Sequence, residues 1–110
     1  MERPTIPTVS TSVTLDELRT LTMAQHRYNK PLTQLFEDAA NFWRDYIDHY
    51  GDYELPALPV SSRMGVQVVL SSEALEAIDR IRASRYSRAV ALYAAIRLWL
   101  DREQQGGATL

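Results

Sequence analysis

Two short stretches of this chain alternate between apolar and polar residues, namely residues 8–13 and residues 64–70. This period of two is typical of a strand that is buried on one face only. The residues on the apolar side are Val9, Thr11 and Val13 in the first stretch, and Val66, Val68 and Leu70 in the second. We therefore predict two short strands, each with one face in the core.

Each predicted strand is followed by two segments whose apolar residues recur at helical spacing, first a shorter and then a longer one. The apolar positions of the shorter helices are Leu18, Leu21 and Ala24, and Leu75, Ile78 and Ile81. Those of the longer helices are Phe36, Ala39, Ala40, Phe42 and Trp43, and Leu92, Ala95, Ile96, Leu98 and Trp99. Both tryptophans continue an apolar stripe, so we place them in the core.

Hydrogen-bonding residues stand where three of these helices are expected to begin. Thr14 is followed three residues later by Glu17, which is the spacing of a capping box. Ser71 and Ser87 are good N-cap residues for the two helices of the second half. Pro31 suits the first position of the remaining helix, because the N–H that proline lacks has no helical partner there.

The order strand, short helix, long helix occurs twice along the chain. An offset of 57 residues superimposes the strands and short helices, and an offset of 56 superimposes the long helices with their tryptophans. Any two amphipathic helix pairs can be aligned with one gap, but the matching strands, caps and tryptophans favour a structural repeat. We expect copies at residues 8–49 and 63–103, joined by a linker at 50–62, with the two strands paired antiparallel over one shared core.

The net charge of −2 argues by itself against a nucleic-acid partner, but the charges are unevenly distributed. Residues 63–102 contain seven arginines and four acidic residues, a net charge of +3. Residues 8–47 have a net charge of −1, and residues 48–62 contain three acidic residues and no basic one. The second copy is therefore basic enough to face a polyanion, with the acidic linker turned away from it.

Several classes of function are not expected. The chain has no cysteine, which excludes disulfides, thiolate metal sites and cysteine nucleophiles. It has neither a nucleophile motif nor a glycine-rich phosphate loop, so we expect no enzyme and no cofactor. Asp45, Asp48, His49 and Asp52 are interpreted as an exposed acidic helix end rather than a metal site. Neither a signal peptide nor a membrane-spanning run is present, which predicts a cytoplasmic protein.

A strand, a helix, a turn and a second helix follow closely in the second copy. The run is Val66-Gln-Val-Val-Leu-Ser-Ser-Glu-Ala-Leu-Glu-Ala-Ile-Asp79, then Arg85-Tyr-Ser-Arg88, then a helix to about residue 102. This pattern resembles the ribbon-helix-helix family of the Arc and MetJ type, and the first copy resembles it more loosely. The implied fold is mainly α with a short two-stranded antiparallel ribbon. One chain supplies both copies as a pseudo-dimer, as in the tandem members found among conjugative relaxosome proteins.

The resemblance implies binding of double-stranded DNA, with the ribbon in the major groove and a phosphate at the N-terminus of each long helix. The implied base-reading residues are Thr8, Ser10, Ser12, Gln67 and Val69. Gln67 is the best of them, because an amide can bond adenine through two hydrogen bonds. The implied phosphate-binding residues are Lys30, Leu32, Arg63, Arg85, Ser87 and Arg88. The predicted strands place no Arg or Lys on the outward face, where the family often has one.

The sequence leaves the biological role open between a transcriptional repressor and an accessory protein of plasmid or conjugation DNA processing. The alternative from a different class is a protein-interaction module, an antitoxin or adaptor, that uses the acidic segment around Tyr46, Tyr50 and Tyr53. We expect a monomer that folds as a pseudo-dimer. Self-association on DNA and a domain-swapped dimer remain open alternatives.

Overall fold

The computed structural model describes residues 8–50, 55–61, 63–82 and 85–104. Within these ranges the chain forms two strands and four helices. In chain order they are β1 (Thr8–Thr14), α1 (Leu15–Tyr28), α2 (Leu32–Tyr50), β2 (Arg63–Val69), α3 (Ser72–Arg82) and α4 (Arg88–Gln104). The prediction of a mainly helical chain with one two-stranded antiparallel sheet is confirmed.

The two strands pair along their whole length, from Thr8 opposite Val69 to Thr14 opposite Arg63. Ser10 lies opposite Gln67 near the middle of the ribbon, and these two residues are separated by the 57-residue offset found in the sequence. The second strand starts one residue earlier than predicted. Arg63 therefore belongs to β2, which corrects the expectation that no outward strand position is basic.

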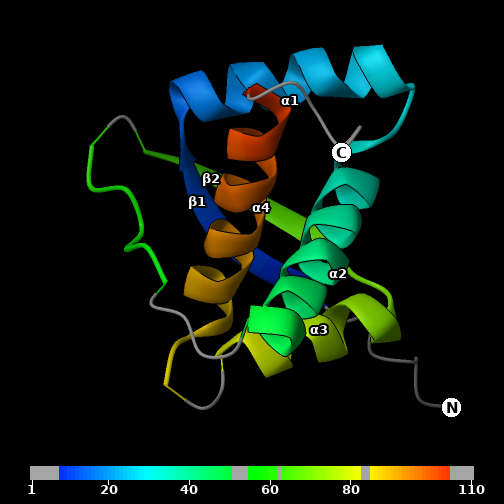
Figure 1. The fold of residues 1–110 in the computed structure, drawn as a ribbon. Helices are drawn as coiled ribbons and strands as arrows, with labels where there is room; N and C mark the ends of the chain where they lie inside the picture. The colour runs from blue at the N-terminus through cyan, green and yellow to red at the C-terminus, as the bar shows by residue number, and fades with distance from the viewer. Residues whose placement is uncertain (1–7, 51–54, 62, 83–84, 105–110) are drawn as a thin grey trace, which may run out of the picture.

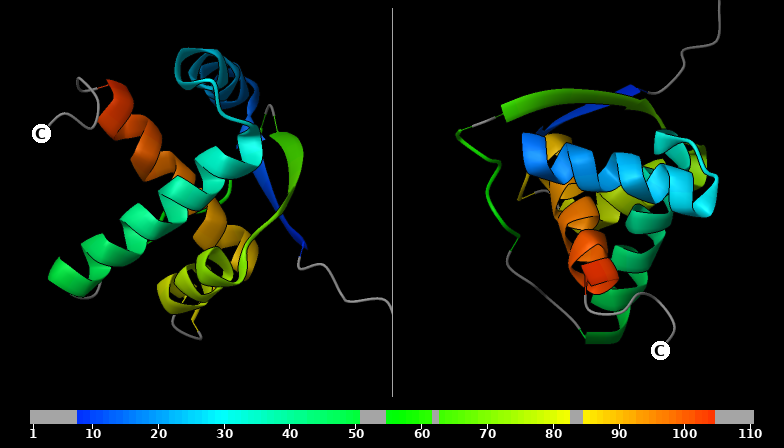
Figure 2. Two further views of the ribbon diagram at one scale, coloured as in Figure 1. Left: turned by 90° about the vertical axis from the view of Figure 1, so that its right-hand side faces the viewer. Right: turned by 90° about the horizontal axis from the view of Figure 1, so that it is seen from above.

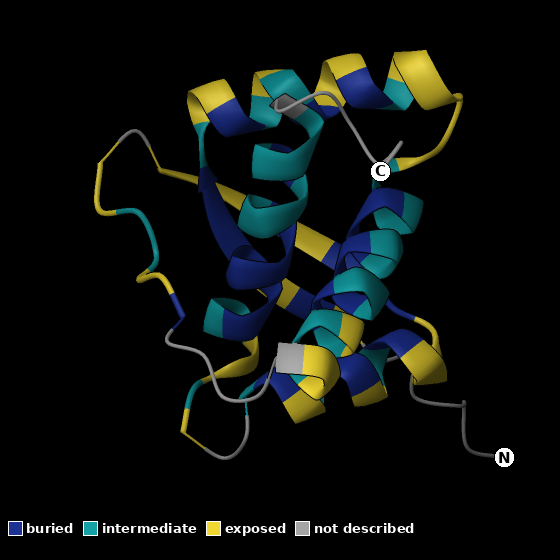
Figure 3. Ribbon diagram, in the orientation of Figure 1, coloured by how far each residue is buried: buried dark blue, intermediate teal, exposed yellow. Residues whose placement is uncertain are grey.

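All four helices lie on one side of the ribbon, and the core fills the space between the two layers (Figures 1 and 2). Figure 3 shows the buried residues on the sides of the helices and strands that face each other. The largest fully buried side chains include Leu21, Leu35, Phe36, Trp43, Leu70, Ile78, Leu92, Ile96 and Leu100. The alternation seen in the sequence thus places one face of the ribbon against the helices and leaves the other uncovered.

Thr11, the polar residue among the predicted inward positions, is buried and makes a tertiary contact. Its hydroxyl donates a hydrogen bond of 2.7 Å to the carbonyl oxygen of Ala89 in the first turn of α4. The hydrogen bond offsets the cost of burying the hydroxyl, since an unpaired buried polar group is strongly unfavourable. It also fixes the start of α4 directly behind β1.

The helices begin where the sequence indicates in three of four cases. Thr14 and Glu17 form the predicted capping box, with the Thr14 hydroxyl accepting from the Glu17 N–H at 3.1 Å. The Ser71 and Ser87 hydroxyls each accept a backbone N–H of the first turn at 3.2 Å. Pro31 differs from the prediction because α2 begins at the next residue. Its carbonyl oxygen accepts the first helical N–H groups, so Pro31 stands before the helix rather than at its first position.

A buried carboxylate joins α1 to α4. Glu17 is 7% exposed and accepts hydrogen bonds from the Tyr93 hydroxyl at 2.9 Å and from Arg97 at 2.8 Å. Burial raises the pKa of Glu17, but the hydrogen bonds from Thr14 N–H, Arg97 and Tyr93 outweigh it and hold the pKa below its ordinary value. Burial and the neighbouring carboxylate raise the pKa of Tyr93 to about 12. The capping box explains only part of what Glu17 does.

The two tryptophans differ in their surroundings. Trp43 is 1% exposed, as predicted for a core residue, with the ring of Tyr46 stacked on it at 5.2 Å between centroids. Leu55, from the described part of the linker, is buried beside it. Trp99 is only half-buried and meets Tyr28 edge to face at 6.3 Å. The core prediction is therefore confirmed for Trp43 but only in part for Trp99.

None of the helices in the described ranges combines the length and the apolar character needed to cross a membrane.

Candidate nucleic-acid interface

The outward face of the ribbon is polar, and the helices leave it uncovered. Strand alternation places two rows of side chains on it. They are Thr8, Ser10 and Ser12 from β1, and Arg63, Gly65, Gln67 and Val69 from β2. All of these except Ser12 are exposed. A two-stranded ribbon with one uncovered face has the width that the DNA major groove admits.

Ser12 is on the predicted face but is not accessible. It is 7% exposed because the Arg63 side chain reaches diagonally across the ribbon and donates from Nε to the Ser12 hydroxyl at 2.9 Å. Gly65 lies opposite Ser12, and the space beside its Cα is open. While Arg63 holds this position, the Ser12 hydroxyl is not available to a base edge.

Arg63 also lies on this face, although we expected it to bind a phosphate. It stands in the outward row of β2, and its hydrogen-bond partner is the neutral hydroxyl of Ser12. Among the described residues, no carboxylate pairs with it. Its guanidinium can therefore leave Ser12 for a guanine edge or a phosphate without breaking an ion pair.

The middle of the face is formed by Ser10 and Gln67, which lie opposite each other and are both exposed. Val69 is 46% exposed at one end, opposite Thr8. An amide and a hydroxyl that face solvent side by side offer donors and acceptors to base edges, and an exposed valine offers an apolar contact for a thymine methyl. The structure places these predicted base-reading residues together.

The start of α4 carries two of the predicted phosphate-binding residues. Ser87 caps the helix, and Arg88 donates from Nε and Nη2 to the two carboxylate oxygens of Asp79, both at 2.9 Å. Arg82 also donates to Asp79 at 2.9 Å. The hydrogen bond from Arg88 holds the pKa of Asp79 below its ordinary value, so this carboxylate is charged at neutral pH. A phosphate at this end of α4 therefore competes with Asp79 for Arg88.

The start of α2 resembles the start of α4 but offers fewer groups to a phosphate. Lys30 forms an ion pair of 2.9 Å with Asp38, which also accepts a hydrogen bond from Gln34. Leu32 is the first residue of α2 and can offer only its backbone N–H. Both helix starts therefore combine free N–H groups with a cation that already has an acidic partner.

Two further cations of the second copy, Arg85 and Arg80, make other contacts. Arg85 is exposed and its guanidinium lies 5.3 Å from the centre of the Tyr86 ring. Arg80 pairs with Asp48 at 2.6 Å, so the end of α3 is tied to the end of α2. This ion pair places the basic end of α3 against the acidic end of α2.

The segment proposed for a protein partner is only partly described. Tyr46 is half-buried against Trp43, so it covers the core rather than standing free as an anchor. The Tyr50 side chain and Tyr53 lie outside the described residues, as does Asp52 of the acidic group. In the described part of the chain, no group of three or more His, Asp or Glu side chains is placed to hold a metal ion.

The arrangement offers non-covalent recognition by an uncovered polar ribbon flanked by two helix N-termini. Comparison of the chain with protein-family models, with curated proteins and with solved structures found no match.

Proposed function

We propose that this chain binds double-stranded DNA by laying β1 and β2 into the major groove. The observation that carries the proposal is the exposed outward face, with Gln67 and Ser10 at its middle and all four helices behind it. Major-groove edges present distinct donor and acceptor patterns, and these side chains supply both.

We further propose that the chain is a tandem ribbon-helix-helix protein that folds as a single-chain pseudo-dimer. The repeated order β1–α1–α2 and β2–α3–α4 supports this, as does the equivalent capping of α1 by Thr14 and of α3 by Ser71. The position of Ser10 opposite Gln67 adds to the support. An antiparallel pair related by a two-fold axis places equivalent residues opposite each other where the axis passes.

Phosphate contacts in this proposal come from the cations Arg63, Arg85, Lys30 and Arg88 and from the N–H groups at Leu32 and Ser87. Lys30 and Arg88 must exchange a carboxylate partner, Asp38 and Asp79 respectively, to make these contacts. An exchange of one anion for another gains less than a new contact, because Asp79 and Asp38 are left without their cations. We therefore expect base contacts to carry a large share of the affinity, with modest non-specific binding.

The proposed role is that of a cytoplasmic transcriptional repressor or of an accessory protein in plasmid or conjugation DNA processing. The two strands present different side chains, with Ser10 and Thr8 on one and Gln67 and Arg63 on the other. Palindromic operators mirror protein two-fold symmetry, so unlike strands favour an asymmetric or direct-repeat site.

The test is selection of DNA sites from a random duplex pool, followed by a salt titration on the selected site. We expect an asymmetric consensus and a slope of log affinity against log salt no steeper than about −4, from about four cations that contact phosphate. Recovery of perfect palindromes alone contradicts the unlike-strand model. Failure to bind any duplex at low salt, with a protein co-purifying instead, favours the interaction module.

A further inference from the structure

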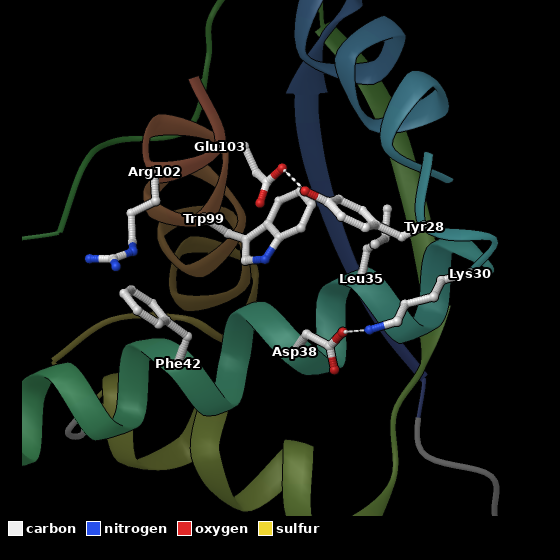
Figure 4. Close-up of a pocket in the computed structure, with 8 residues that line it drawn as sticks. All are labelled: Tyr28, Lys30, Leu35, Asp38, Phe42, Trp99, Arg102 and Glu103. Carbon is white, nitrogen blue, oxygen red and sulfur yellow. Dashed lines mark hydrogen bonds and ion pairs between the residues drawn. The ribbon is translucent and has the colours of Figure 1, made fainter. Parts of the chain in front are cut away.

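A groove of about 310 Å³ opens between the end of α1, the middle of α2 and the last turns of α4 (Figure 4). It lies on the helical layer, away from the outward face of the ribbon. Its aromatic lining comes from Tyr28, Phe42 and Trp99, one from each of these helices. A cavity of this size with aromatic walls and a few polar groups is typical of a site for a small organic molecule.

Three of the four charged side chains that line the groove have an oppositely charged partner. Lys30 pairs with Asp38 at 2.9 Å. Glu103 lies 3.9 Å from Arg27, which is outside the lining, and also accepts a hydrogen bond from the Tyr28 hydroxyl. Arg102 differs, because its guanidinium lies over the Phe42 ring at 4.6 Å and no carboxylate among the described residues pairs with it. Arg102 therefore brings to the groove a positive charge that no described carboxylate pairs with, held at an aromatic wall.

The other half of the molecule shows what fills the corresponding position. The 56-residue offset matches Trp99 with Trp43 and Arg102 with Tyr46. Tyr46 stacks on Trp43 with an angle of 9° between the rings, and Trp43 is sealed from solvent. In the second half Arg102 replaces the stacking ring, so Trp99 lacks the cover that Tyr46 provides.

Trp99 also has a hydrogen-bond donor to offer. Figure 4 shows the indole nitrogen on the side of the ring that faces α2, where Phe42 and Asp38 line the groove. Within the described part of the chain, no hydrogen bond from this nitrogen is seen. A ligand in the groove can therefore meet an aromatic face, an N–H donor and a guanidinium together.

We propose that the groove binds a planar aromatic carboxylate of one or two rings. The ring stacks on Trp99, as Tyr46 does on Trp43, and the carboxylate accepts two hydrogen bonds from Arg102. This site does not depend on DNA binding, because it uses none of the outward ribbon residues.

The probe is 2-naphthoate, titrated into the full-length chain labelled with ¹⁵N. The two indole N–H signals are assigned by comparison with Trp99→Phe. We expect a saturable shift of the Trp99 signal and little change in the Trp43 signal, since Trp43 is sealed. The neutral analogue 2-naphthamide and the non-aromatic cyclohexanecarboxylate should each bind at least about 10-fold more weakly, because one lacks the charge and the other the ring.

Arg102→Gln should weaken 2-naphthoate at least about 10-fold, whereas Arg19→Gln, an exposed arginine on the outer side of α1, should leave it unchanged. Thermal melting checks that both variants are folded, and the comparison of the three probes tests the site without any variant. The proposal is overturned by absence of a saturable Trp99 shift. It is equally overturned by equal affinity for the amide, or by unchanged affinity in a folded Arg102→Gln.

Discussion

The helices α1 and α3 occupy equivalent places after the two strands, yet they are attached to the core in different ways. The buried side of α3 is entirely apolar and consists of Ala74, Ala77, Ile78 and Ile81. The buried side of α1 includes a carboxylate and consists of Glu17, Leu21 and Ala24. By the 57-residue offset, Glu17 stands where the second half has Ala74.

The residues that cap α1 and α3 each need an acceptor for their backbone N–H, and the two halves supply it from different helices. In both cases the acceptor is a glutamate. Thr14 donates to Glu17 of its own helix at 2.8 Å, and Ser71 donates to Glu37 of α2 at 2.6 Å. The counterpart of Glu37 in the other half is Tyr93, which donates to Glu17. The glutamate that accepts the N-cap N–H thus lies on the short helix in the first half and on the long helix in the second. The equivalent position on the other helix is Tyr93 in one case and Ala74 in the other.

A second consequence appears on the long helices. Arg97 corresponds to Asn41 of α2 by the 56-residue offset. Arg97 bonds both Glu17 and Asp101, whereas the buried Oδ1 of Asn41 has no hydrogen-bond partner among the described residues. The buried side of α1 therefore includes an ion-paired carboxylate, whereas the buried side of α3 is apolar and its ion pairs lie at the surface. The buried carboxylate should make the attachment of α1 respond to pH.

The largest expected effect is the loss of stability when the apolar contact between α3 and the core is weakened. Ile78→Ala should lower the free energy of unfolding by about 3 kcal/mol, because Ile78 is fully buried and the deletion leaves a cavity. Its counterpart variant Leu21→Ala should cost less, about 2 kcal/mol, because the polar side of α1 lets the site relax. Urea unfolding measures both, and Glu76→Ala on the exposed side of α3 is the control. A larger loss for Leu21→Ala than for Ile78→Ala contradicts the comparison.

The next effect compares the two strands at the middle of the ribbon. Under the proposed DNA binding, Gln67→Ala should cost about 2 kcal/mol at the selected site, because a bidentate base contact is lost. Ser10→Ala should cost less than about 1 kcal/mol, since one hydroxyl discriminates weakly. Competition binding against random DNA measures both. Equal losses on specific and random DNA mean that the ribbon is not the reading surface.

Local features of the fold could be predicted from the sequence because they depend on neighbours along the chain. Strand alternation, helical stripes and the caps at Thr14, Ser71 and Ser87 all involve residues within a few positions. The first residue of β2 was missed because Arg63 precedes the apolar alternation and is recruited to the sheet by pairing with Thr14.

The features that sequence reasoning missed depend on residues far apart in the chain. Ser12 is buried by a side chain 51 positions away, and only the strand register brings Arg63 to it. Glu17 was explained fully by its capping box, whereas Tyr93 and Arg97 reach it from 76 and 80 residues away. A buried polar position on an otherwise apolar stripe, as at Glu17, is the signal that was available.

The ion-paired attachment of α1 predicts a specific response to acid. The pKa of Glu17 is lowered in the folded protein, so its contribution to stability is complete above its ordinary pKa of 4.5. That contribution is lost as the pH falls through the lowered value. Glu17→Gln should cost about 1–2 kcal/mol at pH 7, because Arg97 then meets a neutral amide, and progressively less as the pH falls below 4.5. Urea unfolding at several pH values measures this, with Glu76→Gln as the control. A loss that stays the same at every pH contradicts it.

The smallest expected effect comes from the two proposed phosphate clamps, which are the start of α4 with Arg88 and the start of α2 with Lys30. Asp79 holds Arg88 through two hydrogen bonds and Arg82 through one, whereas Lys30 is the one cation in the described ranges that pairs with Asp38. If these cations exchange a carboxylate for a phosphate when DNA binds, removing the carboxylate should strengthen binding. Asp79→Asn should raise the affinity for the selected duplex about fivefold at low salt, and Asp38→Asn about twofold, because Asp79 holds Arg88 through two hydrogen bonds and Asp38 holds Lys30 through one.

The same measurement separates local release from the general loss of a negative charge. Asp45→Asn removes an exposed carboxylate whose closest cation, Arg44, is not among the proposed DNA contacts, so it should change affinity little. Raising the salt concentration should reduce the gain from Asp79→Asn, because the freed Arg88 adds a phosphate contact and steepens the salt dependence. Weaker binding by Asp79→Asn than by the parent would mean that Asp79 positions Arg88 for DNA rather than competing for it. Equal gains in affinity from all three variants would mean that only the change in net charge matters and that neither clamp is released locally.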